Sequence, residues 1–494
     1  MAGAEGYTRG SGPTLPVGWS AVMIPDRLQA LVEETAVLSE RFGAAGHRLY
    51  LVGGVVRDAV LGRLNDSSDL DFTTDARPDD IEAIVAPVAE ALWTQGKRFG
   101  TIGLRSGGRA MQITTHRAEA YRPDSRKPDV VFSEAVEADL SRRDFTVNAM
   151  ALSLPELTLI DPFDGVGDLG AARLRTPLDP EESFTDDPLR MMRAARFLAG
   201  YGLVPDQRLY DAVVALRSRL DIVSDERIRD ELDKLLVVER PGAGLWFLVR
   251  TGLAEEFLPE LPALALEQDP VHRHKDVLAH TIAVVEKTSA TRLVRLAALF
   301  HDVGKPKTRS FGPGGTVSFH HHEVVGARMT RDRMRALRYG NDDIDAVTRL
   351  VDLHLRFHTY SMGWTDAAVR RYVRDAGPLL AELNELTRCD CTTRNESKAR
   401  ALSRRMDQLE ARITELRTSE ELAAIRPDLD GVAVMSRLGL RPGRAVGAAL
   451  AFLLELRVDE GPLGEEEAGR RLDAWWAGHA GDFGSPGGPR PPLV

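Results

Sequence analysis

Cysteine is scarce in this sequence, and long apolar runs are missing. The 494 residues include two cysteines, Cys389 and Cys391, which lie too close together to link distant segments. This scarcity favours a reducing compartment over a secreted, disulfide-linked fold. No apolar run approaches the roughly eighteen residues that span a bilayer, and residues 1–20 lack the apolar centre of a secretory signal. We therefore expect a cytoplasmic protein without a membrane partner.

An excess of positive charge is also lacking, because 64 Lys and Arg face 74 Asp and Glu and give a formal net charge of −10. A nucleic-acid partner usually requires a basic surface, so the overall charge does not favour one. The segment 394–417 differs from this net negative charge, because it has seven basic residues and four acidic ones. Its basic residues are Arg394, Lys398, Arg400, Arg404, Arg405, Arg412 and Arg417. It is either a face for an RNA backbone or an amphipathic helix with ion pairs between successive turns.

The length and the apolar content of 43% allow several hydrophobic cores. Residues 1–20 and 479–494 are rich in Gly or Pro and are expected to be flexible tails. A helical stretch and short strand-like runs predict an α+β head over 21–176. Successive amphipathic stretches predict an all-helical neck over 177–268. A proline-marked break then separates a third unit, 269–395, from a helical C-terminal region, 396–478.

The most informative segment is LVGGVVRDAVLGRLNDSSDLDFTT, Leu51 to Thr74. Alternation along a strand places Asp69 and Asp71 on one face and turns Leu70 into a core. Two converging carboxylates repel each other, and an oxygen-seeking cation such as Mg²⁺ compensates that cost. Gly53 and Gly54 let backbone N–H groups approach phosphate oxygens closely. Each piece alone is equally typical of a turn or a solvated strand end, but the combination predicts nucleotidyl transfer.

Two further strings point the same way. Ser141 to Leu152 reads SRRDFTVNAMAL, which in isolation would suit a surface salt-bridge cluster. Phe184 to Leu203 reads FTDDPLRMMRAARFLAGYGL, and its arginines at 190, 193 and 196 recur along one side of a helix, where three cations favour an anion. The alternative for this second string is a capping Asp followed by helix-surface arginines.

Together these strings resemble the class II tRNA nucleotidyltransferases, the family of CCA-adding enzymes and bacterial poly(A) polymerases. The likeness runs from about Leu49 to the region of Asn395. It implies an α+β protein with a polymerase-β-like nucleotidyltransferase head, an all-helical neck, an HD domain and a helical tail.

The resemblance also implies roles for individual residues. Asp69 and Asp71 would be catalytic and hold Mg²⁺, and the nucleotide would be bound by Gly54, Arg57, Arg143, Asp187, Arg190, Arg193 and Arg196. Asp187 and Arg190 would act as a protein template that accepts cytosine or adenine, because a carboxylate and a guanidinium can match a base edge. The family more often has Glu where this chain has Asp186, so the template role is assigned to Asp187.

The third unit contains an ordered set of histidines and aspartates that resembles an HD phosphohydrolase domain. Its implied metal ligands are His280, His301, Asp302, His322, His354 and Asp390. Imidazole with carboxylate suits Mn²⁺, Fe²⁺, Co²⁺, Ni²⁺ or Zn²⁺, and such an ion could activate water against a phosphoester. The alternative is a domain kept for packing and tRNA contact. Cys389 and Cys391 flank Asp390 but are not favoured as ligands.

We therefore expect template-independent addition of C, C and A to the 3′ end of tRNA, from CTP and ATP, with release of pyrophosphate. Poly(A) polymerases and enzymes that add only CC or only A share these motifs. An HD phosphohydrolase with an RNA-binding head is the alternative from another class, and a non-catalytic RNA-binding protein is a third. The intact Asp-x-Asp pair favours the transferase. No oligomeric state is predicted.

Overall fold

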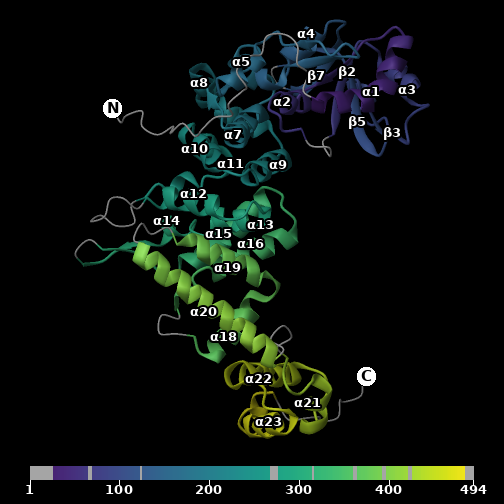
Figure 1. Ribbon diagram of the computed structural model, residues 1–494. Helices are drawn as coiled ribbons and strands as arrows, with labels where there is room; N and C mark the ends of the chain where they lie inside the picture. Colours follow the sequence, from purple (N-terminus) through teal and green to yellow (C-terminus); the bar gives the residue numbers. More distant parts are fainter. Residues whose placement is uncertain are drawn as a thin grey trace, which may run out of the picture. The chain divides into compact units, whose positions relative to one another are not determined.

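The computed structural model describes residues 26–64, 69–122, 125–266, 276–313, 316–359, 364–391, 396–420 and 426–483 (Figure 1). The predicted tail 1–20, residues 484–494 of the other predicted tail, and Arg394 lie outside the described residues. The chain divides into two compact units, Met1–Ala263 with Ala336–Tyr339 and Leu264–Arg335 with Gly340–Val494. The finer division into head, neck, HD domain and C-terminal region stays a prediction.

The first unit contains a seven-stranded mixed sheet in the order β3-β4-β5-β2-β1-β8-β9. β2 pairs parallel with β5, and the other neighbours in this sheet are antiparallel. The strands are β1 (Leu49–Val52), β2 (Leu70–Thr74), β3 (Ala91–Trp93), β4 (Thr101–Ser106), β5 (Arg109–Thr115), β8 (Ala151–Leu154) and β9 (Leu159–Ile160). A separate hairpin consists of β6 (Arg117–Arg122) and β7 (Ser125–Phe132). The predicted α+β class is confirmed.

Helices flank this sheet and continue beyond it. In the head they are α1 (Asp26–Ala44), α2 (Gly54–Val60), α3 (Pro78–Val85), α4 (Val136–Ser141) and α5 (Gly165–Gly170), with short 3₁₀ turns η1 (Lys97–Phe99) and η2 (Thr146–Asn148). The neck helices are α6 (Pro180–Asp186), α7 (Leu189–Tyr201), α8 (Gln207–Leu216), α9 (Asp225–Leu236), α10 (Gly242–Arg250) and α11 (Leu253–Phe257), with the 3₁₀ turns η3 (Arg217–Ile222) and η4 (Pro262–Leu264). Strands β10 (Arg173–Leu174) and β11 (Val204–Pro205) pair in parallel, so the neck is helical except for one short strand.

Local chemistry explains where α7 ends and where α8 begins. Gly202 follows α7 with a φ of 66°, a left-handed conformation that glycine adopts readily. Asp206 caps α8 by accepting a hydrogen bond from the backbone N–H of Leu209. Within α7, Met191, Met192 and other apolar residues are buried, which holds the helix against α9 and α10 (Figure 1). The arginines of α7 are thereby fixed relative to the head.

The second unit is mostly helical. Its first part has α12 (Val277–Lys287), α13 (Arg292–Phe300), α14 (Lys305–Thr308), α15 (His322–Ala336), α16 (Asn341–Leu353), α17 (Arg356–Thr359), α18 (Asp366–Ala376) and α19 (Leu380–Asp390). It continues with α20 (Glu396–Glu420), α21 (Gly431–Leu438), α22 (Arg444–Glu460) and α23 (Glu465–His479), and it includes the short turns η6 (Gly377–Leu379) and η8 (Ala480–Phe483). A hairpin of β12 (Arg309–Phe311) and β13 (Val317–Phe319) interrupts the helices, and the sequence pattern did not predict it.

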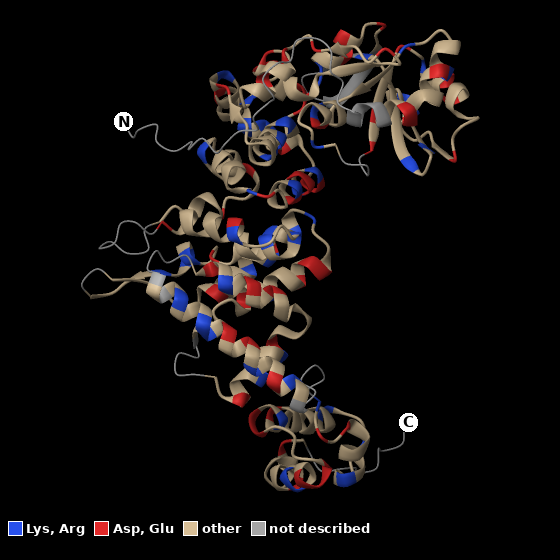
Figure 2. Cartoon of the chain, viewed as in Figure 1, with Lys and Arg blue, Asp and Glu red and all other residues tan. Residues whose placement is uncertain are grey.

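The basic stretch predicted near 394–417 falls on α20. Basic and acidic residues both occur along this helix (Figure 2). Its apolar side buries Met406, Leu409, Ile413 and Leu416. Arg412 pairs with Asp366 and with Glu415 three residues later on the helix. These contacts are those of an amphipathic helix with ion pairs. Among the described residues, no helix combines the length and apolarity needed to cross a bilayer.

Candidate functional site

The Asp pair lies at the start of β2. Leu70 is fully buried and Asp71 is exposed, which is the alternation that the sequence predicted. Although Asp71 as a residue is exposed, the atoms packed around its carboxyl group desolvate it and raise its pKa. The Arg143 charge lowers this pKa and the Asp69 charge raises it, so that it lies above the ordinary value. The Asp69 charge thus disfavours ionisation of Asp71, and the donor chemistry of the two side chains fits a divalent, oxygen-seeking cation.

The glycine pair brings two arginines close to the backbone. Gly53 has a φ of 76° and precedes α2, and a Cβ atom there would lie 3.0 Å from Nη1 of Arg143. A Cβ atom on Gly54 would lie 3.4 Å from Nη2 of Arg57. At position 53 a Cβ atom would be a tight contact to which the Arg143 guanidinium would have to yield, whereas at position 54 it would make an ordinary van der Waals contact with Arg57. Gly53 therefore leaves room for the Arg143 guanidinium beside the backbone.

Arg143 is held by a buried carboxylate on α4. Asp139 is completely buried and accepts from Arg142 at 2.8 Å and from Arg143 at 3.1 Å. Burial alone would raise the pKa of Asp139, but the two guanidinium charges lower it to about 2. The Nε of Arg143 has no hydrogen-bond partner among the described residues. Arg143 is therefore firmly placed yet retains a donor.

Arg57 is enclosed rather than free. Its Nε and Nη2 donate to Asp58 at 2.9 and 3.0 Å, and its Nη1 donates to Asn148 at 2.6 Å. The guanidinium carbon lies 4.1 Å from the ring centre of Tyr201 on α7, and 5.3 Å from that of Phe197. Arg57 is 6% exposed. Its contact with a triphosphate stays a prediction, and the contacts present here link α2 to the neck.

The three arginines of α7 each have a different acceptor. Nη1 of Arg190 donates to Oγ of Ser183 at 2.7 Å. Nε of Arg193 donates to Asp144 at 2.8 Å. Nε of Arg196 donates to Glu231 on α9 at 2.7 Å. The arginine stripe is therefore neutralised in part by buried carboxylates.

The residues expected to act as a template have separate partners. The carboxylate of Asp187 accepts from the backbone N–H of Leu189 at 3.2 Å and pairs with Arg227 at 3.4 Å. Arg190 is buried and also donates to the backbone carbonyl of Arg142. The two residues are joined through the backbone, because the N–H of Arg190 donates to the carbonyl of Asp187 at 3.0 Å. Both stand at the start of α7.

Sequence reasoning missed three acidic residues that hold the arginines, Asp139, Asp144 and Glu231. A signal existed for Glu231, since α9 buries Ile228, Glu231, Leu232 and Leu235 on one face. An acidic residue at an apolar position indicates a buried partner of opposite charge. No comparable signal identified the partner as Arg196, because the two lie on different helices.

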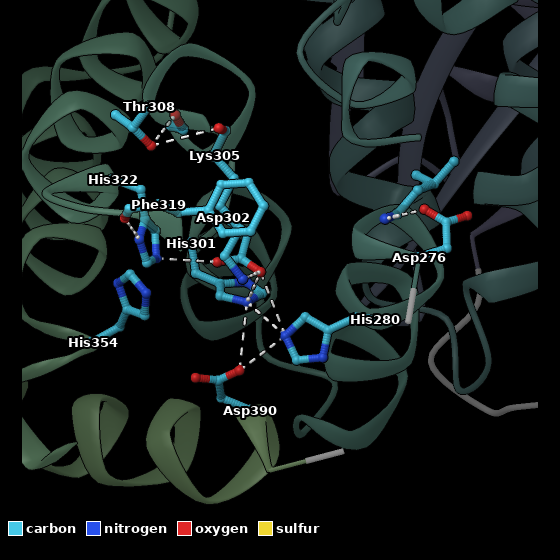
Figure 3. A network of polar contacts seen from close by, with 12 residues as sticks. Asp276, His280, His301, Asp302, Lys305, Thr308, Phe319, His322, His354 and Asp390 are labelled. Atoms are coloured by element: carbon cyan, nitrogen blue, oxygen red, sulfur yellow. Dashed lines mark hydrogen bonds and ion pairs between the residues drawn. The ribbon is translucent and has the colours of Figure 1, made fainter. Parts of the chain in front are cut away.

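A second cluster lies in the second unit, where six side chains converge (Figure 3). They form two groups of potential metal ligands, His280, His301 and Asp390 in one and Asp302, His322 and His354 in the other. The ligand atoms within each group lie within 4.8 Å of one another. The structure thus brings together all six residues that the sequence singled out in this domain.

The histidine rings are oriented in a common way. Nδ1 of His301 contacts the carbonyl of Ala298 at 2.7 Å, Nδ1 of His322 that of Phe319 at 2.8 Å, and Nδ1 of His354 that of Val351 at 2.6 Å. A carbonyl accepts only from a protonated nitrogen, so each ring donates through Nδ1–H and turns its Nε2 toward the cluster. Burial and the nearby charge of His301 lower the pKa of His354 to about 3, which keeps this imidazole neutral.

These donors fit a transition metal. The Nε2 atoms of His322 and His354 are buried and have no hydrogen-bond partner among the described residues. Buried polar atoms rarely lack a hydrogen-bond partner unless a ligand or a metal ion binds them. Cys389 does not compete, because burial raises the pKa of its thiol to about 11. Imidazole with carboxylate is the donor set expected for Mn²⁺, Fe²⁺, Co²⁺, Ni²⁺ or Zn²⁺.

Comparison with known families matches three consecutive regions of the chain. Residues 49–175 match the poly A polymerase head domain. Residues 202–264 match the probable RNA and SrmB-binding site of polymerase A. Residues 277–415 match the HD domain.

Two curated relatives align with most of the chain. An A-adding tRNA nucleotidyltransferase of Deinococcus radiodurans is 33% identical over 441 residues, covering 86% of this chain and 95% of that protein. A CC-adding tRNA nucleotidyltransferase of Thermus thermophilus is 32% identical over 439 residues, covering 86% and 93%. A CCA-adding enzyme of Bacillus velezensis is 38% identical over 218 residues, which is 44% of this chain and 53% of that protein.

Solved structures share the fold. The Bacillus stearothermophilus CCA-adding enzyme in complex with CTP covers 91% of this chain with a TM-score of 0.63 and 23% identity, over 98% of its own length. The apo form I of another CCA-adding enzyme covers 92% with a TM-score of 0.58 and 19% identity, over 95% of its length. The resemblance read from the sequence is confirmed, and the chain belongs to the family of tRNA nucleotidyltransferases with a poly A polymerase head and an HD domain.

Proposed function

We propose that this protein adds C, C and A to the 3′ end of tRNA without a nucleic-acid template, using CTP and ATP and releasing pyrophosphate. The observation that carries the proposal is the meeting of Asp71, Arg143 and the Gly53–Gly54 turn at one end of β2. Acidic ligands, a guanidinium and an accessible backbone are the groups that a nucleoside triphosphate requires. The two relatives that align with most of the chain support the same reaction class.

In this proposal Asp69 and Asp71 hold Mg²⁺. Bound there, Mg²⁺ would lower the pKa of the tRNA 3′-hydroxyl and neutralise the triphosphate during in-line attack at the α-phosphorus. Arg143 contributes its unpaired Nε beside these carboxylates. Gly54 leaves the backbone open for a phosphate oxygen. Arg57, Arg193 and Arg196 shape the walls of the nucleotide site, each kept in place by the contacts described above.

Base selection is assigned to Asp187 and Arg190. A carboxylate accepts from the amino group of cytosine or adenine, and a guanidinium donates to ring acceptors. Arg190 cannot swing freely, since it is buried against Ser183 and Arg142. A rigid donor beside the Asp187 carboxylate favours one hydrogen-bonding pattern over another. UTP and GTP present the wrong pattern and should be rejected.

Loss of the acidic pair provides the direct test. We expect Asp69→Ala and Asp71→Ala each to abolish incorporation of labelled CTP and ATP into tRNA that lacks its 3′ end. Asp80→Ala is the matched control, because Asp80 is exposed on α3 of the same head. Undiminished incorporation by both variants would refute the assigned metal site.

Partial addition is the competing reading within the family. The relatives matched over most of the chain are an A-adding and a CC-adding enzyme, whereas the CCA-adding relative matches 44% of the chain. Sequencing extended 3′ ends after incubation with all four nucleotides separates these products. CCA ends support the proposal. Ends limited to CC, growth by A alone, or long A tracts would assign a CC-adding enzyme, an A-adding enzyme or a poly(A) polymerase.

A second activity is favoured by the cluster in the HD domain. Six potential metal ligands, among which His322 and His354 have buried Nε2 atoms without a hydrogen-bond partner among the described residues, suit hydrolysis of a phosphoester, such as a 2′,3′-cyclic phosphate. The test is hydrolysis of that substrate with Mn²⁺ or Ni²⁺, before and after His301→Ala. Activity that survives the substitution would exclude the assigned ligands. Cytoplasmic location also belongs to this proposal, supported by two free cysteine thiols.

A further inference from the structure

Ser183, on α6, contacts both of the residues that are assigned to base selection. Its Oγ accepts a hydrogen bond from Nη1 of Arg190 at 2.7 Å, and its backbone carbonyl accepts from the backbone N–H of Asp187 at 3.2 Å. The carbonyl of Asp187 in turn accepts from the backbone N–H of Arg190 at 3.0 Å. The three residues therefore form a closed ring of hydrogen bonds. We propose that Ser183 is a positioning residue that sets which bases are accepted, an inference that rests on the proposed roles of Asp187 and Arg190.

The guanidinium of Arg190 is held at both of its terminal nitrogens. Nη1 donates to Ser183, and Nη2 donates to the backbone carbonyl of Arg142, which follows α4 in the head. A planar group that is anchored at two nitrogens keeps one orientation, whereas a single anchor lets it pivot. Among the described residues no acceptor is found for Nε of Arg190. The guanidinium therefore has a fixed plane and retains donor capacity for a base.

Ser183 is itself fixed by the fold. It is 4% exposed, and its backbone N–H donates to the carbonyl of Asp179 at 3.0 Å. Pro188 disfavours a helical conformation in the residue before it, and Asp187 accordingly has a φ of −135° and a ψ of 96°. The chain therefore leaves α6 at Asp187 before α7 begins. This junction allows a side chain of α6 to meet the first turn of α7.

A fixed guanidinium explains how uracil and guanine are rejected. At the ring position where cytosine and adenine have an acceptor nitrogen, uracil and guanine have an N–H group. A donor held against another donor leaves both groups unpaired in a buried site, and this is costly. Without the hydroxyl of Ser183, Arg190 would keep one anchor and could move away from that N–H group. The hydroxyl therefore acts on the rejection of wrong bases, and it acts through Arg190.

The test measures kcat and KM for each of the four nucleoside triphosphates on tRNA that lacks its 3′ end. In Ser183→Ala we expect the preference for CTP and ATP over UTP and GTP to fall about tenfold, which is the value of one well-placed base contact. The change should lie in KM, with kcat for CTP and ATP nearly unchanged. Ser224→Ala is the matched control, because Ser224 is an exposed serine of the neck whose side chain caps no backbone N–H. It should keep the parent preference.

A second substitution covers the case in which Ser183→Ala does not fold. Ser183→Cys nearly conserves the shape of the side chain but replaces the hydroxyl oxygen with a weak acceptor, so it should lose the same preference. Combination with Arg190→Ala then separates positioning from a structural effect. If Ser183 acts through Arg190, the double variant Ser183→Ala, Arg190→Ala should show no lower preference than Arg190→Ala alone.

Three results would contradict the inference in different ways. Equal losses for all four nucleotides, or an added loss of preference in the double variant, would overturn the positioning role and leave the transferase proposal intact. An unchanged preference in Arg190→Ala would overturn the assigned base selection together with this inference. Failure of the parent protein to add any nucleotide would refute the proposed function itself, and this inference with it.

Discussion

Nε of Arg193 on α7 donates to Oδ2 of Asp144 in the head at 2.8 Å. Asp144 also accepts from Asn148, whose own amide oxygen accepts from Arg57. A single buried carboxylate therefore connects the neck arginines to the glycine turn. Arg57 and Arg193, which lie far apart in the sequence, are thereby joined by a chain of hydrogen bonds through Asn148 and Asp144.

Replacing Asp144 with Asn should lower both the folding stability and the affinity for the nucleotide. Asp144→Asn leaves the partly buried Arg193 without its counter-charge, and we expect a loss of about 3 kcal/mol in unfolding free energy. We also expect a higher KM for CTP, because Arg193 loses its anchor. Urea denaturation and initial-rate kinetics provide the measurements, with Asp80→Asn as control. A change below about 0.5 kcal/mol would show that the pair is not structurally important.

The lowered pKa of the same carboxylate predicts that the protein loses folding stability at acid pH. Burial would raise the pKa of Asp144, but the Arg193 charge and the Asn148 hydrogen bond lower it to about 2, from the ordinary value of 3.8. A depressed carboxyl pKa adds stability above the unfolded value, and this is lost as pH falls through the folded value. We expect about 2 kcal/mol to disappear between pH 4 and pH 2. Denaturation curves across this range should show a smaller decline in Asp144→Asn.

Gly53→Ala and Gly62→Ala form a matched pair. Both positions have positive φ, 76° and 66°, so each substitution should cost about 1–2 kcal/mol of stability. A Cβ atom at 53 also lies 3.0 Å from Arg143, whereas one at 62 has no neighbour within 4 Å. Only Gly53→Ala should therefore reduce kcat/KM for CTP and ATP. Equal kinetics for the two variants would remove Arg143 from the nucleotide site.

Tyr201 should be needed for its ring and not for its hydroxyl. The ring covers the Arg57 guanidinium at 4.1 Å and stacks on Phe197 with ring centres 5.3 Å apart. Tyr201→Leu should cost about 1–2 kcal/mol and raise KM for both nucleotides, while Tyr201→Phe should behave like the parent protein. Thermal unfolding with steady-state kinetics distinguishes the two. A deficient Tyr201→Phe would assign the effect to the hydroxyl.

Much of the architecture could be predicted because it is encoded locally. Alternation placed Leu70 in the core, and helical spacing located α7 and α9. The four histidines of the HD domain came together as expected because their motif order reflects a known domain. By contrast, the partners of Arg193 and Arg196 come from other elements, and pairing between distant segments leaves no periodic trace. The β12–β13 hairpin was missed because its strands have three residues each, too few for an alternating pattern.

Three imidazoles in the HD domain each contact the backbone carbonyl three residues upstream, from 301 to 298, from 322 to 319 and from 354 to 351. Their orientation is therefore set by neighbouring peptide units before any cation arrives. Binding of a metal ion would then cost little side-chain rotational entropy. Loading should be governed by how quickly ions reach the interior, with no slow rearrangement of the protein.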